Sequence, residues 1–209
     1  MNLRGQQLNE VPYVVHELVA LEELDLDLNQ LVELPAWLGE HTQLKTLSLY
    51  HNQLTAVPDS LWQLVKLQRC NFAALPEALG NLVNLRMLDL GHNQLTALPV
   101  SIGNLTQLEF LYISNNRLTS VPDILARLSN LRYLNITDNQ LASLPASIGS
   151  MKRLIELRLY NNRFTELPNV VGQLTKLKEL HLMDNALTTL PAAIGDLDSL
   201  RKLVLQGNS

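Results

Sequence analysis

The sequence predicts an α/β repeat solenoid, a curved ladder with short parallel strands on its concave face and turns or 3₁₀ pieces on its convex face. Two observations predict this fold class. Leucine accounts for 49 of the 209 residues, and proline recurs every 23 residues with a single interval of 18. Self-similarity at a fixed period of about 20 to 50 residues is typical of repeat architectures. We therefore expect residues 1–209 to form a single repeat domain with partial units at both ends.

Two residue types mark the repeat independently. The prolines are Pro12, Pro35, Pro58, Pro76, Pro99, Pro122, Pro145, Pro168 and Pro191. The asparagines on the same interval are Asn29, Asn52, Asn93, Asn116, Asn139, Asn162, Asn185 and Asn208. Both series show the same deletion of five residues, which leaves one shortened repeat at residues 67–84.

Most units contain an alternation of leucines near their start, as in Leu88-Asp89-Leu90. A period of two is typical of a strand with one buried face. So short a strand cannot bury its leucines alone, whereas stacked copies share a core between neighbours. Because every unit repeats the same direction, the strands should pair in parallel, with the proline-started stretch as the crossover.

One complete unit runs from Leu131 to Gly149 and reads L-x-x-L-x-L-x-x-N-x-L-x-x-L-P-x-x-I-G. It resembles the leucine-rich repeat family, and its L-P-x-x-I-G form with a 23-residue period resembles the bacterial and Ras-suppressor-like intracellular subgroup. This resemblance implies a recognition or scaffold module that binds another protein.

The recurring asparagines have a predicted structural role. Each follows a strand where the chain turns between two neighbouring units, and buried backbone groups at such turns need hydrogen-bond partners. An amide side chain both donates and accepts, so it can join adjacent turns.

The shortened repeat lacks one asparagine and one core leucine. It reads Leu67-Gln-Arg-Cys70-Asn-Phe72-Ala-Ala-Leu75-Pro76. One interpretation is a tolerated shortening, and the alternative is a kink or a binding notch. We expect the solenoid to be least stable here, because losing a buried leucine costs about 2–5 kcal/mol where a cavity remains.

Composition excludes several classes of protein. The net charge of −4 disfavours a general nucleic-acid binder, and no apolar run is long enough to span a membrane. The single Cys70 and the absence of a secretory pattern favour a cytoplasmic location. We find no catalytic constellation, expect no cofactor or metal, and do not expect an enzyme. His16-Glu17 begins like a zinc motif, but Ala20 stands where the second histidine is needed.

Candidate binding residues lie on the concave face, where residues between the strand leucines point outward. Aromatic, methionine and arginine side chains there are typical of protein interfaces, although exposed rings can also stiffen a sheet by cross-strand packing. The predicted partner-binding residues are Tyr50, His51, Met87, Asp89, Phe110, Tyr112, Tyr133, Asn135, Arg158, Tyr160 and His181.

Three acidic rungs precede this surface. Glu23, Asp25 and Asp27 alternate onto the same predicted face, and residues 1–40 contain eight acids and one base. A solvated acidic end is one interpretation, and a site for a basic peptide is another. A hard metal such as calcium is a third but is disfavoured, because three carboxylates on a flat strand do not wrap a cation.

The resulting prediction is a module that recognises a protein or peptide partner on its concave face. The alternatives are the sensing or targeting arm of a larger kinase, GTPase or ubiquitin ligase, and a solenoid that self-assembles into a homo-oligomer through uncapped ends. An acidic end and a mildly basic remainder would favour head-to-tail pairing in the last case.

Overall fold

The structure is a computed structural model of the 209-residue chain. It describes residues 1–41, 43, 46–49, 52–54, 58, 74–75, 77–81, 83 and 85–209. Most of the shortened repeat, with Cys70 and Phe72, lies outside the described residues, so the expectation of low stability there stays a prediction.

Short parallel strands form the inner side of the molecule. They are β1 (Glu23–Asp25), β2 (Thr46–Ser48), β3 (Met87–Asp89), β4 (Phe110–Tyr112), β5 (Tyr133–Asn135), β6 (Glu156–Arg158), β7 (Glu179–His181) and β8 (Lys202–Val204). β1 pairs with β2, and β3 to β8 pair in chain order, all in parallel. Each of β4 to β7 therefore hydrogen-bonds to the strand of the unit before it and to the strand of the unit after it.

Short 3₁₀ helices form the outer side. They are η1 (Tyr13–Val15), η2 (Ala36–Glu40), η4 (Glu77–Asn81), η5 (Val100–Asn104), η6 (Asp123–Arg127), η7 (Ala146–Ser150), η8 (Asn169–Gln173) and η9 (Ala192–Asp196). In η5 to η9 the residue before the helix is a proline with φ between −64° and −72°. The ring fixes this angle, so the same residue starts the outer turn in successive units.

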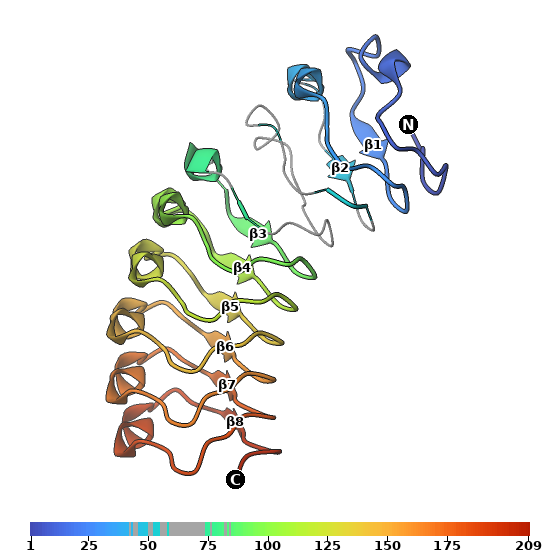
Figure 1. Cartoon of the computed structure of the whole chain (residues 1–209). Helices are drawn as coiled ribbons and strands as arrows, with labels where there is room; N and C mark the ends of the chain where they lie inside the picture. The colour runs from blue at the N-terminus through green and yellow to red at the C-terminus, as the bar shows by residue number, and fades with distance from the viewer. Residues whose placement is uncertain are drawn as a thin grey trace.

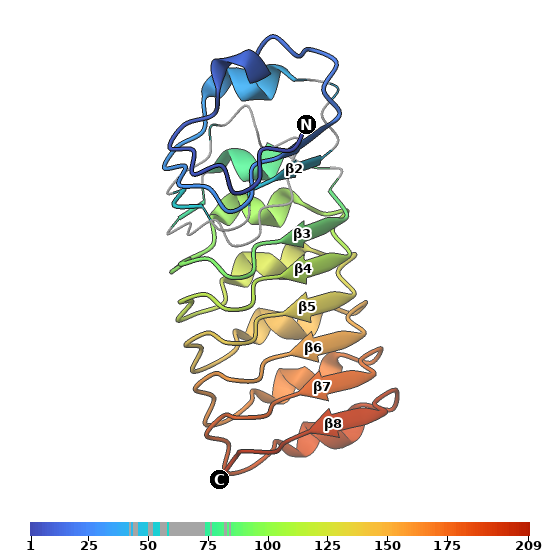
Figure 2. The same ribbon diagram turned by 90° about the vertical axis from the view of Figure 1, so that its right-hand side faces the viewer.

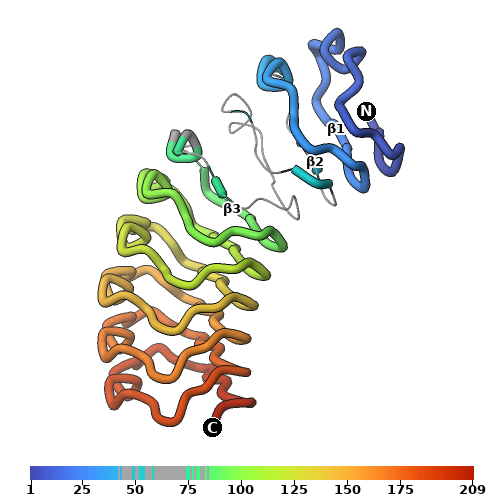
Figure 3. The backbone as a smooth tube through the Cα atoms, in the orientation of Figure 1, coloured from blue at the N-terminus to red at the C-terminus, as the bar shows by residue number. Residues whose placement is uncertain are grey.

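The units stack into the predicted curved solenoid, with strands on the concave face and 3₁₀ helices on the convex face (Figure 1). Figure 2 views the ladder of strands with the helices behind it, and the backbone trace in Figure 3 shows the same path repeated from unit to unit. No helix in the described part of the chain is long and apolar enough to cross a bilayer.

A single row of aliphatic residues fills the space between the two sides. Strand leucines such as Leu111, Leu134 and Leu157 are at most 1% exposed and align on one another in the strand register. Leu125 and Ile148 from the outer helices close the core from the opposite side. Burial of these side chains is the main source of the stability of each unit.

The predicted asparagine bridges are present. The side chain of Asn139 accepts a hydrogen bond from the Leu118 amide and donates to the carbonyls of Ile113 and Ile136. Asn116 repeats the pattern one unit earlier, bonding the Leu95 amide and the Leu90 carbonyl. Each amide thus satisfies backbone groups of its own unit and of the preceding one, which confirms the structural role of these residues.

Candidate functional site: the concave face

The strand register places each concave position directly beside its equivalent in the next unit. Met87 pairs with Phe110, and Phe110 pairs with Tyr133. A second column contains Asp89, Tyr112, Asn135, Arg158 and His181. The structure therefore brings most of the predicted binding residues onto one surface.

Three rings and one thioether form what we call the aromatic ladder, defined as Met87, Phe110, Tyr112 and Tyr133. The rings of Phe110 and Tyr133 stack with their centroids 4.7 Å apart and their planes 4° apart. Tyr112 lies 6.5 Å from Phe110, and Met87 remains 49% exposed. The rings are half-buried, so the ladder is an ordered surface that still has apolar area to bury against a partner.

A small cavity of about 170 Å³ opens beside the ladder. Leu134 forms part of the cavity wall. Two other lining residues are bonded to each other, because Arg158 donates a hydrogen bond from Nε to the Glu156 carboxylate. Burial raises the pKa of the Tyr112 hydroxyl, and the negative charge of Glu156 raises it further. The cavity is lined by Tyr112, Tyr133, Leu134, Asn135, Glu156 and Arg158.

Several predicted site residues have other surroundings. His181 is only 7% exposed, and its Nε2 lies 2.9 Å from a Glu179 carboxylate oxygen. Asp27 is 7% exposed and forms an ion pair of 2.7 Å with Arg4 of the preceding unit. Tyr160 is half-buried and makes no ring contact with the described aromatic residues.

These surroundings have a physical reason. Strand alternation fixes which side a residue faces, but side chains in adjacent rungs can cover it. Arg4 lies 23 residues before Asp27, and one full repeat brings the two side chains together.

Three of the predicted polar residues also hold their own turns. One carboxylate oxygen of Asp25 accepts the amide of Asp27, and one of Asp89 accepts the amide of Gly91. Such contacts two residues onward are typical of Asx turns. Asn135 makes the same contact with the amide of Thr137 at 3.1 Å. Glu23 is exposed beside this series.

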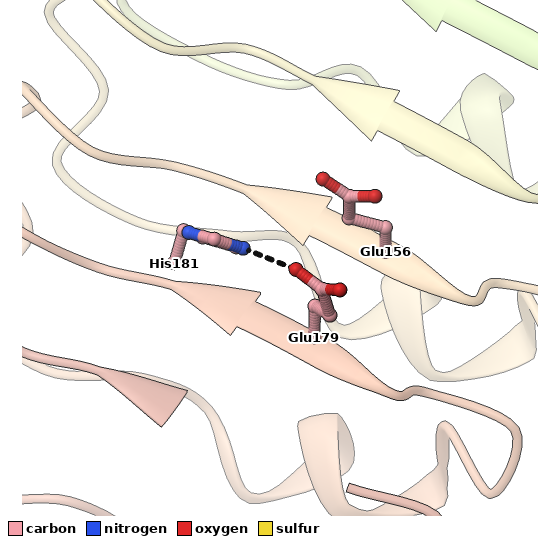
Figure 4. A group of neighbouring side chains, drawn as sticks. All are labelled: Glu156, Glu179 and His181. Atoms are coloured by element: carbon pink, nitrogen blue, oxygen red, sulfur yellow. Dashed lines mark hydrogen bonds and ion pairs between the residues drawn. The ribbon is translucent and has the colours of Figure 1, made fainter. Parts of the chain in front are cut away.

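Glu156, Glu179 and His181 are the described side chains that come closest to a metal-binding set, with one potential ligand atom from each within 4.8 Å of the others (Figure 4). Their charges already have partners, because Arg158 bonds Glu156 and Lys202 lies 3.7 Å from Glu179. A divalent cation would have to compete with both bases for these carboxylates.

The binding residues predicted from the sequence do not include the residues just before each strand. A cavity of about 460 Å³ lies at this edge of the sheet, adjoining the concave face. It is lined by Gln107, Glu109, Asn130, Arg132, Arg153, Ile155 and Lys176. Bases recurring immediately before the strands, such as Arg86, Arg132 and Lys178, were the available signal.

Two predicted residues, Tyr50 and His51, lie outside the described residues. Their place in the binding surface therefore stays a prediction, as does the contribution of the acidic rungs.

Three sequence families match the chain. A leucine-rich repeat region matches residues 122–208, a family described as two copies of leucine-rich repeats matches residues 83–126, and a single leucine-rich repeat matches residues 43–64. No curated protein sequence matches this chain closely enough to count as a relative.

Solved structures with the same fold come from several organisms. The leucine-rich repeat domain of the type III effector XopL is 28% identical with a TM-score of 0.81, over 98% of this chain and 75% of that one. The ectodomain of the receptor kinase GASSHO1/SCHENGEN3 from Arabidopsis thaliana, in complex with CASPARIAN STRIP INTEGRITY FACTOR 2, is 33% identical with a TM-score of 0.74, over 96% and 26%.

Toll from Drosophila, in its complex with Spatzle, is 25% identical with a TM-score of 0.86. The match covers 100% of this chain and 31% of that one, so the chain spans under a third of both receptors. The parallel strands stack, prolines start the 3₁₀ turns, asparagines bridge the units, and three repeat families match. The chain therefore has the leucine-rich repeat fold, with leucine-rich repeats matched at residues 43–64 and 83–208.

Proposed function

We propose that this chain binds a protein or peptide partner on its concave face, with the aromatic ladder at the centre of the contact. The observation that carries this proposal is the stacked pair Phe110 and Tyr133, which stays half-buried on an ordered strand surface. Aromatic side chains with few rotatable bonds lose little conformational entropy on binding and are enriched among the residues that dominate interface energy.

The comparisons support this class of function. Two of the similar structures are complexes, one with CASPARIAN STRIP INTEGRITY FACTOR 2 and one with Spatzle. We further propose that the chain belongs to the 23-residue bacterial and Ras-suppressor-like subgroup, on the strength of its L-P-x-x-I-G units, and that it acts in the cytoplasm, given the single Cys70.

A display library of random peptides tests the proposal. Clones are selected on the wild-type protein, and their affinities are measured for the double variant Phe110→Ala/Tyr133→Ala by biolayer interferometry. We expect the double variant to bind about 30-fold more weakly, because truncating two residues at an interface centre costs about 2 kcal/mol or more.

Tyr13→Ala is the matched control, because Tyr13 is 66% exposed on η1 and lies away from the concave strands. Circular dichroism should show that all three proteins keep the same fold. Clones that bind the double variant as tightly as the wild type would rule out the ladder as the binding surface.

A further inference from the structure

Basic side chains gather along one edge of the described six-stranded sheet. The stretches just before β3 to β8 carry Arg86, Arg132, Lys152, Arg153, Lys176, Lys178 and Arg201, which we call the basic edge. The same stretches carry two acids, Glu109 and Asp198, so seven bases less two acids give this edge a net charge of +5 in a chain of net charge −4. So large a local excess makes the edge a distinct electrostatic surface.

The backbone register aligns the residues immediately before β3 to β8 in one row, and four of these six residues are bases. The Arg132 amide donates to the Glu109 carbonyl, and the Ile155 amide donates to the Arg132 carbonyl. The Lys178 amide then donates to the Ile155 carbonyl. Successive rungs are about 4.8 Å apart, so the basic side chains form a line that runs along the solenoid rather than converging on one point.

Two of the cations lining the edge cavity are not neutralised by the described carboxylates. Glu109 is shared, at 3.7 Å from Arg86 and 3.6 Å from Arg132. Arg153 instead donates to the neutral Asn130 side chain at 2.6 Å, which orients the guanidinium without cancelling its charge. Lys176 forms no ion pair within the described part of the chain.

Asn130 is itself held in place. Its Nδ2 donates to the Thr106 carbonyl at 2.8 Å, one unit earlier. The Arg153 fork is therefore presented by a rigid neighbour, and a preorganised guanidinium is the group best suited to a carboxylate.

The edge also adjoins the aromatic ladder. The guanidinium carbon of Arg132 lies 5.8 Å from the centre of the Tyr133 ring. A chain that crosses the concave face over Tyr133 therefore reaches the edge cavity of about 460 Å³ directly.

We propose that the basic edge binds an acidic, extended segment of the partner that covers the aromatic ladder. This proposal rests on the proposed function, because it assigns the chemistry of that partner. A row of cations from successive units matches a linear run of carboxylates better than it matches a single small anion, and the overall negative charge of the chain disfavours nucleic acid.

A synthetic peptide tests the edge without the ladder. The probe is a fluorescein-labelled peptide of alternating Glu and Ser, and the reference is its Gln-Ser counterpart. Binding is followed by fluorescence anisotropy at about 0.1 M salt, where charges more than about 10 Å apart are largely screened. The variant Arg153→Gln/Lys176→Gln should bind the Glu-Ser peptide about fivefold more weakly, a change of about 1 kcal/mol in total for two exposed charge pairs.

Arg117→Gln/Arg163→Gln is the matched control, because it removes the same charge from two exposed arginines that lie past the strands, on the opposite edge. It should bind the probe within about twofold of the wild type, the residual change being long-range and screened by salt. Equal weakening by both variants, equal binding of the Gln-Ser peptide, or no measurable binding would overturn the proposal.

Two further measurements separate the alternatives. If the protein binds a short DNA duplex more strongly than the Glu-Ser peptide, the ligand of the basic edge is nucleic acid and not an acidic segment. If sedimentation shows a salt-sensitive dimer, the ligand is a second copy of the chain. The Phe110→Ala/Tyr133→Ala variant should still bind the Glu-Ser peptide, which contains no aromatic residue. Loss of the ladder function and loss of the edge function are therefore distinguishable.

Discussion

His41 and His181 are the buried histidines of the described chain, and they differ in what their ring nitrogens contact. His181 bonds Glu179, whereas neither nitrogen of His41 has a hydrogen-bond partner in the described structure, although its side chain is 2% exposed. A buried polar group without a partner costs about 1–3 kcal/mol. The position six residues after the proline is a leucine in other units, such as Leu105 and Leu128.

The substitution His41→Leu should therefore stabilise the protein by about 1 kcal/mol, because an apolar side chain of similar size has no polar atoms to leave unpaired. Urea denaturation followed by circular dichroism measures the change in the free energy of unfolding. His181→Leu is the control and should give no gain, because it breaks the bond to Glu179. A less stable His41→Leu protein would contradict this reading of His41.

Individual residues were predictable from the sequence where one backbone rule decides their role. The asparagine bridges could be predicted because every unit leaves the same backbone groups to satisfy. The surroundings of His181 and Asp27 could not, because they depend on side-chain contacts that strand alternation does not specify. His181 bonds Glu179 of its own strand, and Asp27 pairs with Arg4 of the preceding unit.

Among the elements, β6, β7 and β8 carry a charge network across the concave face. Glu179 on β7 contacts His181 on its own strand and lies 3.7 Å from Lys202 on β8. The hydrogen bond from His181 lowers the pKa of the Glu179 carboxyl below its usual value, and Lys202 lowers it further.

This lowered pKa predicts an acid-dependent contribution to stability. A carboxyl whose pKa is lower in the folded state stabilises the protein above its unfolded pKa, and the contribution is lost as the pH falls through the folded pKa. The melting temperature is measured at neutral pH and at a pH well below 4.5, the ordinary pKa of glutamate. The decrease between the two pH values should be larger for the wild type than for Glu179→Gln. The difference should be small, since the group is exposed. Equal losses in both proteins would contradict it.

The strand and turn elements followed from sequence because period-two leucines and regular prolines each favour one local geometry. The edge cavity did not follow, because it is formed by residues of successive units outside the leucine pattern, such as Arg132, Arg153 and Lys176.

On the scale of the whole molecule, strands pair only with those of adjacent units in the described chain. Leu157 is fully buried and pairs with Leu134 on one side and Leu180 on the other. In such a quasi-one-dimensional structure, stability is a sum of unit terms and nearest-neighbour terms.

Leu157→Ala should therefore act locally. We expect a loss of about 2–5 kcal/mol, with hydrogen exchange rising most in β5 to β7 and least in β1. Leu203→Ala in the part-exposed β8 should cost less, because Leu203 pairs with Leu180 alone among the described strands. Exchange that rises equally along the entire chain would argue against independent neighbouring units.

The repeated asparagine bridge has a consequence for engineering. Each asparagine side chain donates to the backbone carbonyl 26 residues earlier and accepts from the backbone N–H 21 residues earlier. These offsets are the same for Asn139 and Asn162. Excising residues 131–153 would join Asn130 to Leu154. Asn162 would then meet the groups that Asn139 uses, the Leu118 N–H as donor and the Ile113 carbonyl as acceptor. This deletion removes Tyr133 but keeps the hydrogen-bonding pattern between neighbouring units. The concave face can therefore be shortened or lengthened by whole repeats.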